Sequence, residues 1–147
     1  MIVYTIIVTY NGQKWIDFCL GSLSRSTIKT IPIIIDNCSS DKTIDYIRIN
    51  YPEAIIFEQN ENLGFGQANN IGMRYAIEQN ADYVLLLNQD AAIAPDMLEL
   101  CLKQSDEKSL LSPIHMNGDG TKVDYSFREN SLIKCKELID DTFSGNL

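Results

Sequence analysis

Short apolar segments that each end in polar residues recur along this chain, and this repetition constrains the fold more than any other feature. The apolar segments cover residues 2–10, 31–35, 54–57, 83–87 and 110–114. Between them, apolar residues at helical spacing predict helices over about 15–23, 41–50, 68–76 and 95–104. Strands that alternate with helices form right-handed βαβ units around a sheet covered on both faces. The sequence therefore predicts an α/β fold with a mostly parallel sheet.

Two segments carry more specific expectations. Residues 83–87 are apolar on both faces, which is typical of a central strand in a parallel sheet. The helix at 41–50 follows Ser39 and Ser40, either of which is suited to cap it. Asp41 stands in the first turn, where a negative charge is favourable.

Composition narrows the functional classes. A chain of 147 residues that is 45% hydrophobic fits one folded domain. Its net charge is −8 and its 12 Lys and Arg residues are scattered, so we expect no nucleic-acid partner, because phosphate binding needs clustered cations. The chain ends in a less regular region, with one further strand predicted near 121–127.

The cysteines and the N-terminus bear on the compartment. The four cysteines are widely separated, and His115 is the single histidine, so no metal-site spacing is present. This pattern favours reduced thiols in a cytoplasmic protein. The first residues resemble a buried strand and not a signal peptide, and no segment approaches the roughly 20 apolar residues of a membrane span. We therefore expect a soluble protein that is not secreted.

Polar residues follow three of the predicted strands. They are Thr9, Tyr10 and Asn11, then Asp36 and Asn37, and finally Asn88, Gln89 and Asp90. Each group alone is ordinary turn chemistry. Ligands of open α/β sheets bind beyond the carboxyl ends of the strands, where these groups meet if the sheet is parallel. Their joint occurrence predicts a binding site at that edge.

Two carboxylates in these groups are suited to particular contacts. Asp36 could accept a charge-assisted hydrogen bond from a base imide or a ribose hydroxyl. The alternative is that Asp36 forms an Asx-turn or helix cap within residues 36–41. Asp90 is suited to bind Mg2+ or Mn2+, because these cations take one or two carboxylates and leave the remaining positions to substrate phosphates.

The loop at residues 60–70 contains two glycines, Gly64 and Gly66, that would let the backbone approach a ligand closely. It matches neither the dinucleotide fingerprint nor the Walker A loop. No Lys or Arg occurs between Arg48 and Arg74, so a bound diphosphate would find few local cations. This makes a divalent metal on Asp90 more necessary.

Together these motifs resemble those of family-2 glycosyltransferases. The motifs are Val8-Thr9-Tyr10-Asn11, Ile35-Asp36-Asn37-Cys38-Ser39-Ser40-Asp41, Asn62-Leu63-Gly64-Phe65-Gly66 with Asn69-Asn70-Ile71-Gly72, and Leu86-Leu87-Asn88-Gln89-Asp90. The residues of the last two motifs are similar to those of the bacterial rhamnosyltransferase-like branch. Two later segments resemble that branch too, Ser112-Pro113-Ile114-His115 and Gly118-Asp119-Gly120. That branch builds O-antigen, capsule and other surface polysaccharides. The resemblance spans about residues 2–128 and implies the GT-A (Rossmann-like) fold.

The resemblance also implies roles for individual residues in binding a nucleotide sugar. Thr9 and Tyr10 would line the base pocket, and Asp36 would read uracil or thymine. Asp90 would bind the metal that holds the diphosphate, with Asn88 at the position where the family often has a second Asp. The other residues that the resemblance places around the donor are Asn11, Asn37, Gly64, Phe65, Gly66, Asn69, Asn70 and Gln89.

The implied reaction is sugar transfer, with inversion, from a UDP- or dTDP-sugar to a saccharide or lipid-linked acceptor. Such a transfer needs a general base on the acceptor hydroxyl, which in this family lies in a later half of the domain. Residues 1–147 would then be the N-terminal, donor-binding part, with the acceptor half and the base beyond residue 147. A lipid-linked acceptor would bring a cytoplasmic protein to the inner face of the membrane.

Two other readings stay open. The chain could be a non-catalytic module that binds nucleotide sugars, or a nucleotidyltransferase for sugar phosphates. The second would want a glycine-rich loop with Arg or Lys directly after the first strand, and Thr9 to Lys14 does not supply one.

Overall fold

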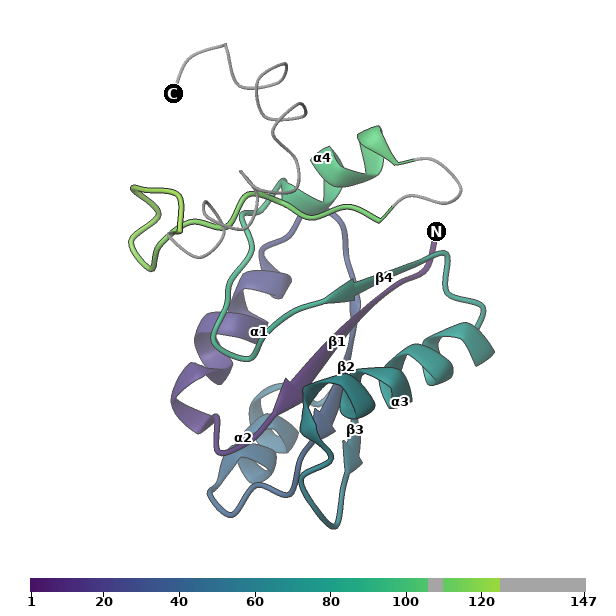
Figure 1. The fold of residues 1–147 in the computed structure, drawn as a ribbon, viewed down its shortest axis with the longest axis vertical. Helices are drawn as coiled ribbons and strands as arrows, with labels where there is room; N and C mark the ends of the chain where they lie inside the picture. The colour runs from purple at the N-terminus through teal and green to yellow at the C-terminus, as the bar shows by residue number, and fades with distance from the viewer. Residues whose placement is uncertain (106–109, 125–147) are drawn as a thin grey trace. The chain divides into compact units, whose positions relative to one another are not determined.

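The computed structural model describes residues 1–105 and 110–124 and contains an open, fully parallel sheet (Figure 1). Its strands are β1 (Val3–Thr9), β2 (Ile31–Asp36), β3 (Ile55–Glu58) and β4 (Tyr83–Leu86), in the order β3-β2-β1-β4. The register pairs Thr9 with Asp36 and Ile6 with Leu86, so the carboxyl ends of the strands lie at one edge. The predicted α/β class and parallel sheet are confirmed.

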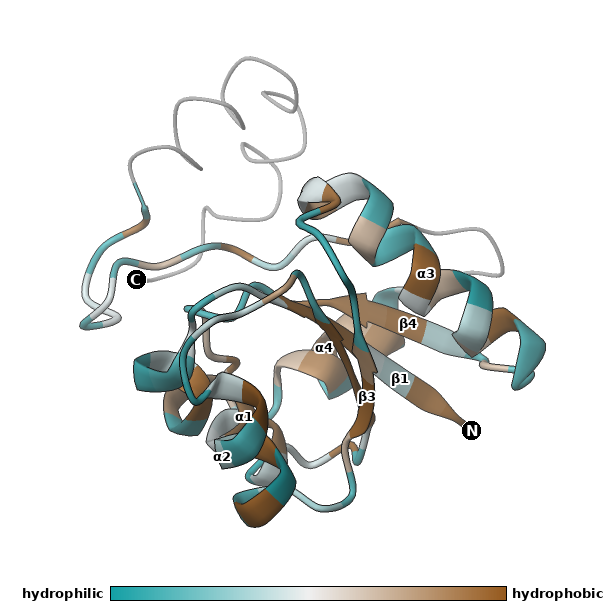
Figure 2. Cartoon of the chain, turned by 90° about the horizontal axis from the view of Figure 1, so that it is seen from below, coloured by the Kyte–Doolittle hydropathy of each residue, from teal (hydrophilic) through white to brown (hydrophobic). Residues whose placement is uncertain are grey.

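Helices cover both faces of this sheet (Figure 2). The short η1 (Gln13–Trp15) leads into α1 (Ile16–Ser24), which lies with α2 (Thr43–Asn50) on one face. The opposite face is covered by α3 (Gly64–Glu78). The fourth helix, α4 (Met97–Gln104), begins two residues after Pro95.

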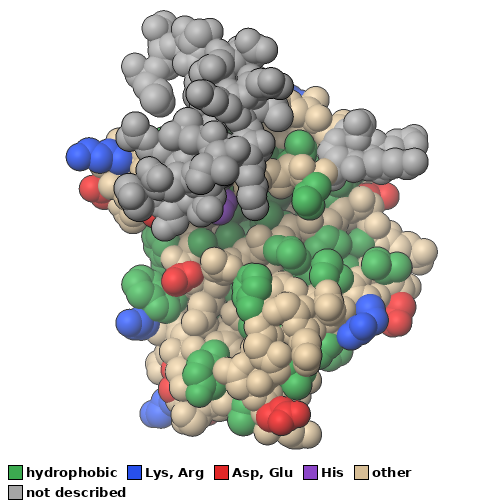
Figure 3. Space-filling model, in the orientation of Figure 1, with side chains coloured by type: hydrophobic (Ala, Val, Ile, Leu, Met, Phe, Trp, Pro, Cys, Tyr) green, Lys and Arg blue, Asp and Glu red, His purple; other side chains and the backbone are tan. Residues whose placement is uncertain are grey.

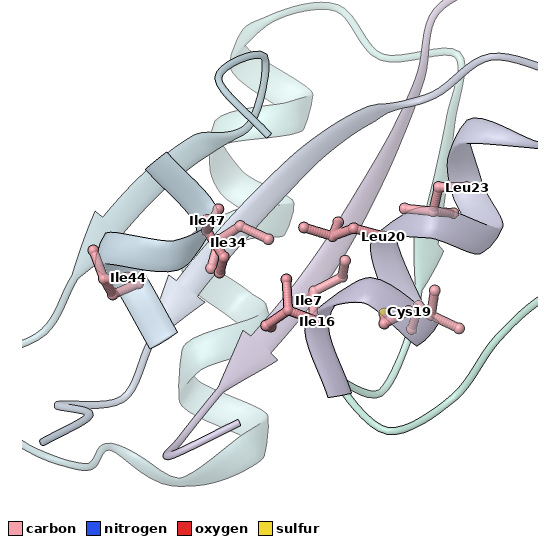
Figure 4. Close-up of a cluster of buried hydrophobic side chains, with 9 residues drawn as sticks. Ile7, Ile16, Cys19, Leu20, Leu23, Ile34, Ile44 and Ile47 are labelled. Carbon is pink, nitrogen blue, oxygen red and sulfur yellow. The ribbon is translucent and has the colours of Figure 1, made fainter. Parts of the chain in front are cut away.

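Alternating residues of the two central strands build a core on each face. Ile7 and Ile34 face α1 and α2, where they pack with Ile16, Leu20 and Ile47 (Figure 4). On the other face, Tyr4, Ile6, Val8, Ile33 and Ile35 pack against Ala68 and Ala76 of α3. Burial of both faces explains why these strands read as continuous apolar runs.

The last strand of the sheet differs from the prediction. Residues 83–87 were expected to form a central strand, whereas β4 is at the edge of the described sheet. Tyr83, Val84 and Leu86 are 39%, 37% and 46% exposed. Figure 3 shows hydrophobic side chains that reach the surface at several places on the face drawn there. An apolar run reports that a strand suits an apolar environment, but it does not report which neighbours the strand has.

Two further expectations are wrong, the strand at residues 110–114 and the cap at Ser39 or Ser40, and a third falls partly outside the described residues. Residues 110–114 form no strand; the nearest β contact is an isolated antiparallel bridge between Met116 and Val123. The expected strand near 121–127 is described only to residue 124, and residues 125–127 lie outside the described part. The helix α2 begins at Thr43, and Asp41, not Ser39 or Ser40, accepts the hydrogen bond from the Thr43 N–H, at 3.0 Å.

The chain divides into two compact units, Met1–Gln104 and Ser105–Leu147. The first unit contains the whole sheet and all the helices named above. The described part of the second unit contains a turn in which the Gly120 N–H donates to the Asn117 carbonyl, at 2.8 Å. Among the helices of the described residues, none has the length and apolar character to span a bilayer.

One side-chain cluster joins α1 to α2 and leads to a prediction about acid stability. Asp17 accepts hydrogen bonds from the Tyr46 hydroxyl at 2.6 Å and from the Tyr51 hydroxyl at 2.8 Å. These two bonds, that from Tyr46 first, lower the pKa of Asp17 below its usual 3.8. A lowered carboxyl pKa contributes stability above the usual pKa, and this contribution is lost as the pH falls through the folded value.

We therefore expect Asp17→Asn to lower the urea midpoint at pH 7, and the difference from the wild type to shrink at pH 3. Glu61→Gln, on the exposed loop before α3, serves as the control for loss of one carboxylate. An equal difference at both pH values would show that the charge of Asp17 does not stabilise the cluster.

Candidate functional site

A cleft of about 440 Å3 lies at the carboxyl edge of the sheet. It is lined by Val8, Tyr10, Asn37, Asn62, Gly64, Phe65, Asn88, Gln89 and Asp90. These residues come from the ends of β1, β2 and β4 and from the start of α3. The predicted meeting of the polar strand ends at one edge is confirmed, because a parallel sheet places those ends side by side.

Asp36 is not among the residues that line the cleft, and its carboxylate organises the end of β2. It is 3% exposed and accepts hydrogen bonds from the Thr9 hydroxyl (2.8 Å) and the Ser39 hydroxyl (2.5 Å). Its second oxygen accepts the Ser39 backbone N–H at 2.8 Å. Asp36 therefore has a local structural role within residues 36–41, although its backbone bond goes three residues on and not two as in an Asx-turn. Asp36 as the reader of a base stays a prediction, and its neighbour Asn37 is the residue that lines the cleft.

Asn11 fastens the loop after β1 to the loop after β2. Its backbone has a positive φ of 48°, which Asn tolerates better than most residues. Its side-chain oxygen accepts the Ser40 N–H at 2.8 Å and the Asp41 N–H at 3.3 Å, and its own N–H donates to the Ser39 hydroxyl at 2.9 Å. Asn11 thus holds these two loops together and does not itself line the cleft.

The loop before α3 forms one wall of the cleft. Gly64 has a positive φ of 76°, a conformation that glycine adopts without strain. The Asn37 side chain contacts this loop by accepting the Leu63 N–H (3.3 Å) and donating to the Gly64 carbonyl (3.4 Å). Phe65, 56% exposed, extends this wall.

A β-turn after β4 carries the third group of polar residues. The Asn88 carbonyl accepts the Ala91 N–H at 3.1 Å and also lies 3.5 Å from the Cys19 thiol that donates to it. Burial, and then the negative charge of Asp90, raise the pKa of Cys19 to about 12. Cys19 therefore stays a neutral thiol at physiological pH and supports the turn without acting as a nucleophile.

The structure separates the predicted site residues into two groups. Those that line the cleft are Tyr10, Asn37, Gly64, Phe65, Asn88, Gln89 and Asp90. Those that do not are Thr9, Asn11, Asp36, Gly66, Asn69 and Asn70. Asn69 is buried and donates to the Phe65 carbonyl at 2.9 Å, which is a role within α3.

The prediction omitted two lining residues, Val8 and Asn62. Asn62 begins the Asn-Leu-Gly-Phe-Gly motif, so its place in that motif was an available signal. Val8 gave no such signal, because an apolar residue inside a buried strand reads as core.

The cleft fits a hard divalent cation that arrives with a phosphorylated substrate. Asp90 is its one carboxylate, and no Lys or Arg is among the lining residues. Within the described residues no three His, Cys, Asp or Glu side chains gather into a ready-made metal site. Mg2+ and Mn2+ commonly bind through one or two carboxylates plus substrate phosphates, and this donor set matches that use.

Comparison with protein families decides which class of α/β protein this is. The sequence model described as "Glycosyl transferase family 2" matches residues 4–144. The chain belongs to glycosyltransferase family 2. This confirms the family inferred from the motifs.

One curated relative of this family-2 chain is the dTDP-rhamnosyl transferase RfbF of Shigella flexneri, which is 25% identical over 124 residues. The match covers 80% of this chain and 40% of the relative, so the chain spans well under half the length of that protein.

Solved structures show the same fold. The mannosyltransferase PcManGT from Pyrobaculum calidifontis, in complex with GDP-Man and Mn2+, is 25% identical, with a TM-score of 0.62 over 69% of this chain and 31% of that one. TarS of S. aureus, in complex with UDP-GlcNAc, is 24% identical, with a TM-score of 0.62 over 70% of this chain and 30% of that one. The predicted GT-A fold is confirmed by these neighbours.

Proposed function

We propose that this chain is the donor-binding part of a glycosyltransferase that uses a UDP- or dTDP-sugar. The transfer would proceed with inversion to a saccharide or lipid-linked acceptor, in the synthesis of a cell-surface polysaccharide. One observation carries the proposal. In a chain that belongs to glycosyltransferase family 2, Tyr10, Asn37 and Asp90 line one cleft at the carboxyl edge of the sheet. The similarity to a dTDP-rhamnosyl transferase supports the choice of donor.

Within this proposal the residues divide the donor between them. Tyr10 directly follows the carboxyl end of β1, is 48% exposed, and offers an aromatic face to the base. The Asn37 amide offers both a donor and an acceptor to a base edge. Asp90 would hold a Mg2+ or Mn2+ ion, which would neutralise the charge that develops on the departing diphosphate. The Mn2+ complex of PcManGT supports a metal in this role.

The acceptor side of the reaction is proposed to lie outside residues 1–147. The matched segment covers only 40% of the dTDP-rhamnosyl transferase RfbF, so that relative is about two and a half times as long as the segment. A general base on the acceptor hydroxyl would belong to that further part. A lipid-linked acceptor would place the protein in the cytoplasm at the inner face of the membrane.

Calorimetric titration of the chain with UDP, dTDP, GDP and ADP, with and without Mn2+, tests the proposal. We expect UDP or dTDP to bind more tightly than GDP and ADP. We also expect their Kd to be much lower in the presence of Mn2+ than in its absence. A folded chain that binds none of the nucleotides would contradict the donor-binding role.

The Asp36→Asn variant tests how the base is recognised. If Asp36 reads the imide of uracil or thymine, this variant changes the preference between UDP and CDP. If Asp36 acts through the turn that it holds, the variant weakens all nucleotides to a similar degree, with no change in preference.

The alternative function is a non-catalytic module that binds nucleotide sugars. Release of UDP or dTDP from a donor sugar in the presence of saccharide acceptors separates the two. A module would bind the donor and leave it intact.

A further inference from the structure

The side chain of Gln89 makes a two-point contact with the backbone of Tyr10, across 79 positions of sequence. The Tyr10 N–H donates to Gln89 Oε1 at 3.0 Å, and Gln89 Nε2 donates to the Tyr10 carbonyl at 3.3 Å. The last backbone bond between these two strand ends joins the Leu87 N–H to the Ile6 carbonyl, at 3.0 Å. The Gln89 amide therefore continues the pairing of β1 with the β4 segment beyond the end of the backbone ladder.

Gly12 provides the space that this contact needs. A Cβ atom at Gly12 would lie 2.1 Å from Gln89 Oε1 and 2.8 Å from Gln89 Cδ. The φ of Gly12 is −103°, so its backbone conformation does not require glycine. Space for the Gln89 amide is the physical reason for glycine at this position. We call the contact of Gln89 with Tyr10, seated over Gly12, the Gln89 clamp.

The clamp fixes the turn that carries Asp90. Gln89 and Asp90 are the two central residues of the turn closed by the bond between the Asn88 carbonyl and the Ala91 N–H. Tyr10, which belongs to the clamp, and Asp90, which directly follows Gln89, both line the cleft. The turn is thus held at two points, by its own closing bond and by the Gln89 side chain, and this double attachment limits how far the backbone that carries Asp90 can move.

We propose that Gln89 is a positioning residue, which holds Asp90 at a set place relative to Tyr10 so that a nucleoside diphosphate and its divalent cation are bound together. This inference rests on the proposed function. Groups that are held in place before binding cost less ordering when the ligand arrives. Loss of the clamp should therefore weaken binding that depends on the metal at Asp90, more than binding of the nucleotide alone.

The test is a double-mutant cycle on Gln89→Ala and Gly12→Ala. The Kd for UDP and for dTDP is measured with and without Mn2+ in the wild type, both single variants and the double variant. We expect each single variant to lose up to about tenfold of the Mn2+-dependent affinity, because two bonds of ordinary strength limit how strongly the ordered turn is favoured in the free protein. The double variant should bind no more weakly than Gln89→Ala alone, because the methyl group added at position 12 then has no Gln89 amide to displace. Gln79→Ala, at the far end of α3, is the matched control and should leave both constants unchanged.

A second measurement reads the clamp in the free protein. Hydrogen exchange at the Tyr10 amide should accelerate in Gln89→Ala and in Gly12→Ala, because each removes the acceptor of that N–H. Gln89→Leu removes both the acceptor and the donor while keeping a side chain of similar size, and it replaces Gly12→Ala in this measurement if the latter does not fold.

The outcomes separate the inference from the proposed function. If the wild type binds UDP or dTDP with Mn2+ and Gln89→Ala binds equally well, the positioning role is wrong and the donor site stands. Additive losses in the double variant also contradict it, since they would mean that Gly12 acts on something other than Gln89. If the wild type binds neither nucleotide, the donor site itself fails, and exchange at Tyr10 still decides whether the clamp exists.

Discussion

Replacement of Asp90 by alanine is expected to remove the Mn2+-dependent gain in UDP or dTDP affinity while the protein stays folded. Asp90 is exposed and is the one carboxylate among the residues that line the cleft, where no Lys or Arg could take over the diphosphate charge. Changes to residues that merely support metal ligands cost about 10- to 100-fold in metal affinity, so loss of the ligand itself should cost at least as much. Calorimetry with and without Mn2+ measures the effect directly.

Two variants control this experiment. Asp96→Ala removes an exposed carboxylate outside the cleft and should leave the Mn2+ effect intact. Asn88→Asp adds a second carboxylate to the same turn and should strengthen Mn2+ binding, because hard cations favour more anionic oxygen ligands. If Asp90→Ala keeps the full Mn2+ effect, the metal is held by another group and the proposed donor site needs a different centre.

Gly72→Ala is expected to destabilise the domain, whereas Gly66→Ala in the same helix is expected to stabilise it. A Cβ at Gly72 would lie 2.7 Å from Cγ2 and 3.0 Å from Cγ1 of Ile6, a fully buried and β-branched side chain of β1. A Cβ at Gly66 meets no atom within 4 Å. Alanine favours a helix over glycine by up to about 1 kcal/mol, and overpacking a core costs about 1–3 kcal/mol.

The two variants share one chemical change in one helix, so the difference between their free energies of unfolding isolates the packing cost. We expect Gly72→Ala to be less stable than Gly66→Ala by about 1–3 kcal/mol in urea denaturation. Equal stability of the two variants would mean that α3 can move away from β1 at little cost. It would also remove the packing reason for glycine at position 72.

Local patterns were sufficient for the helices and strands of the first unit. The apolar runs around Ile7 and Ile34 predicted the two central strands because both faces of each are buried. The meeting of the polar strand ends then followed from the parallel arrangement alone. The same reasoning failed for residues 110–114, since an isolated apolar run does not show that a partner strand is available beside it.

The position of β4 shows a similar limit. Its residues are apolar enough for a central strand, yet in the described sheet it has a neighbour on one side, β1. Sheet order depends on contacts between segments that are far apart in the chain. Hydrophobic spacing within one segment does not contain this information.

The sequence by itself determined the fold class, the family and the sheet edge at which the site lies, because these depend on short-range spacing and on ordered motifs. Only the tertiary structure decided which residues of the polar strand ends line the cleft. Asp36 turns inward to Thr9 and Ser39, whereas Asn37 lines the cleft. It also revealed the contact of Gln89 with Tyr10. Such a contact depends on where two distant loops meet in space, and local backbone preference does not set that meeting point.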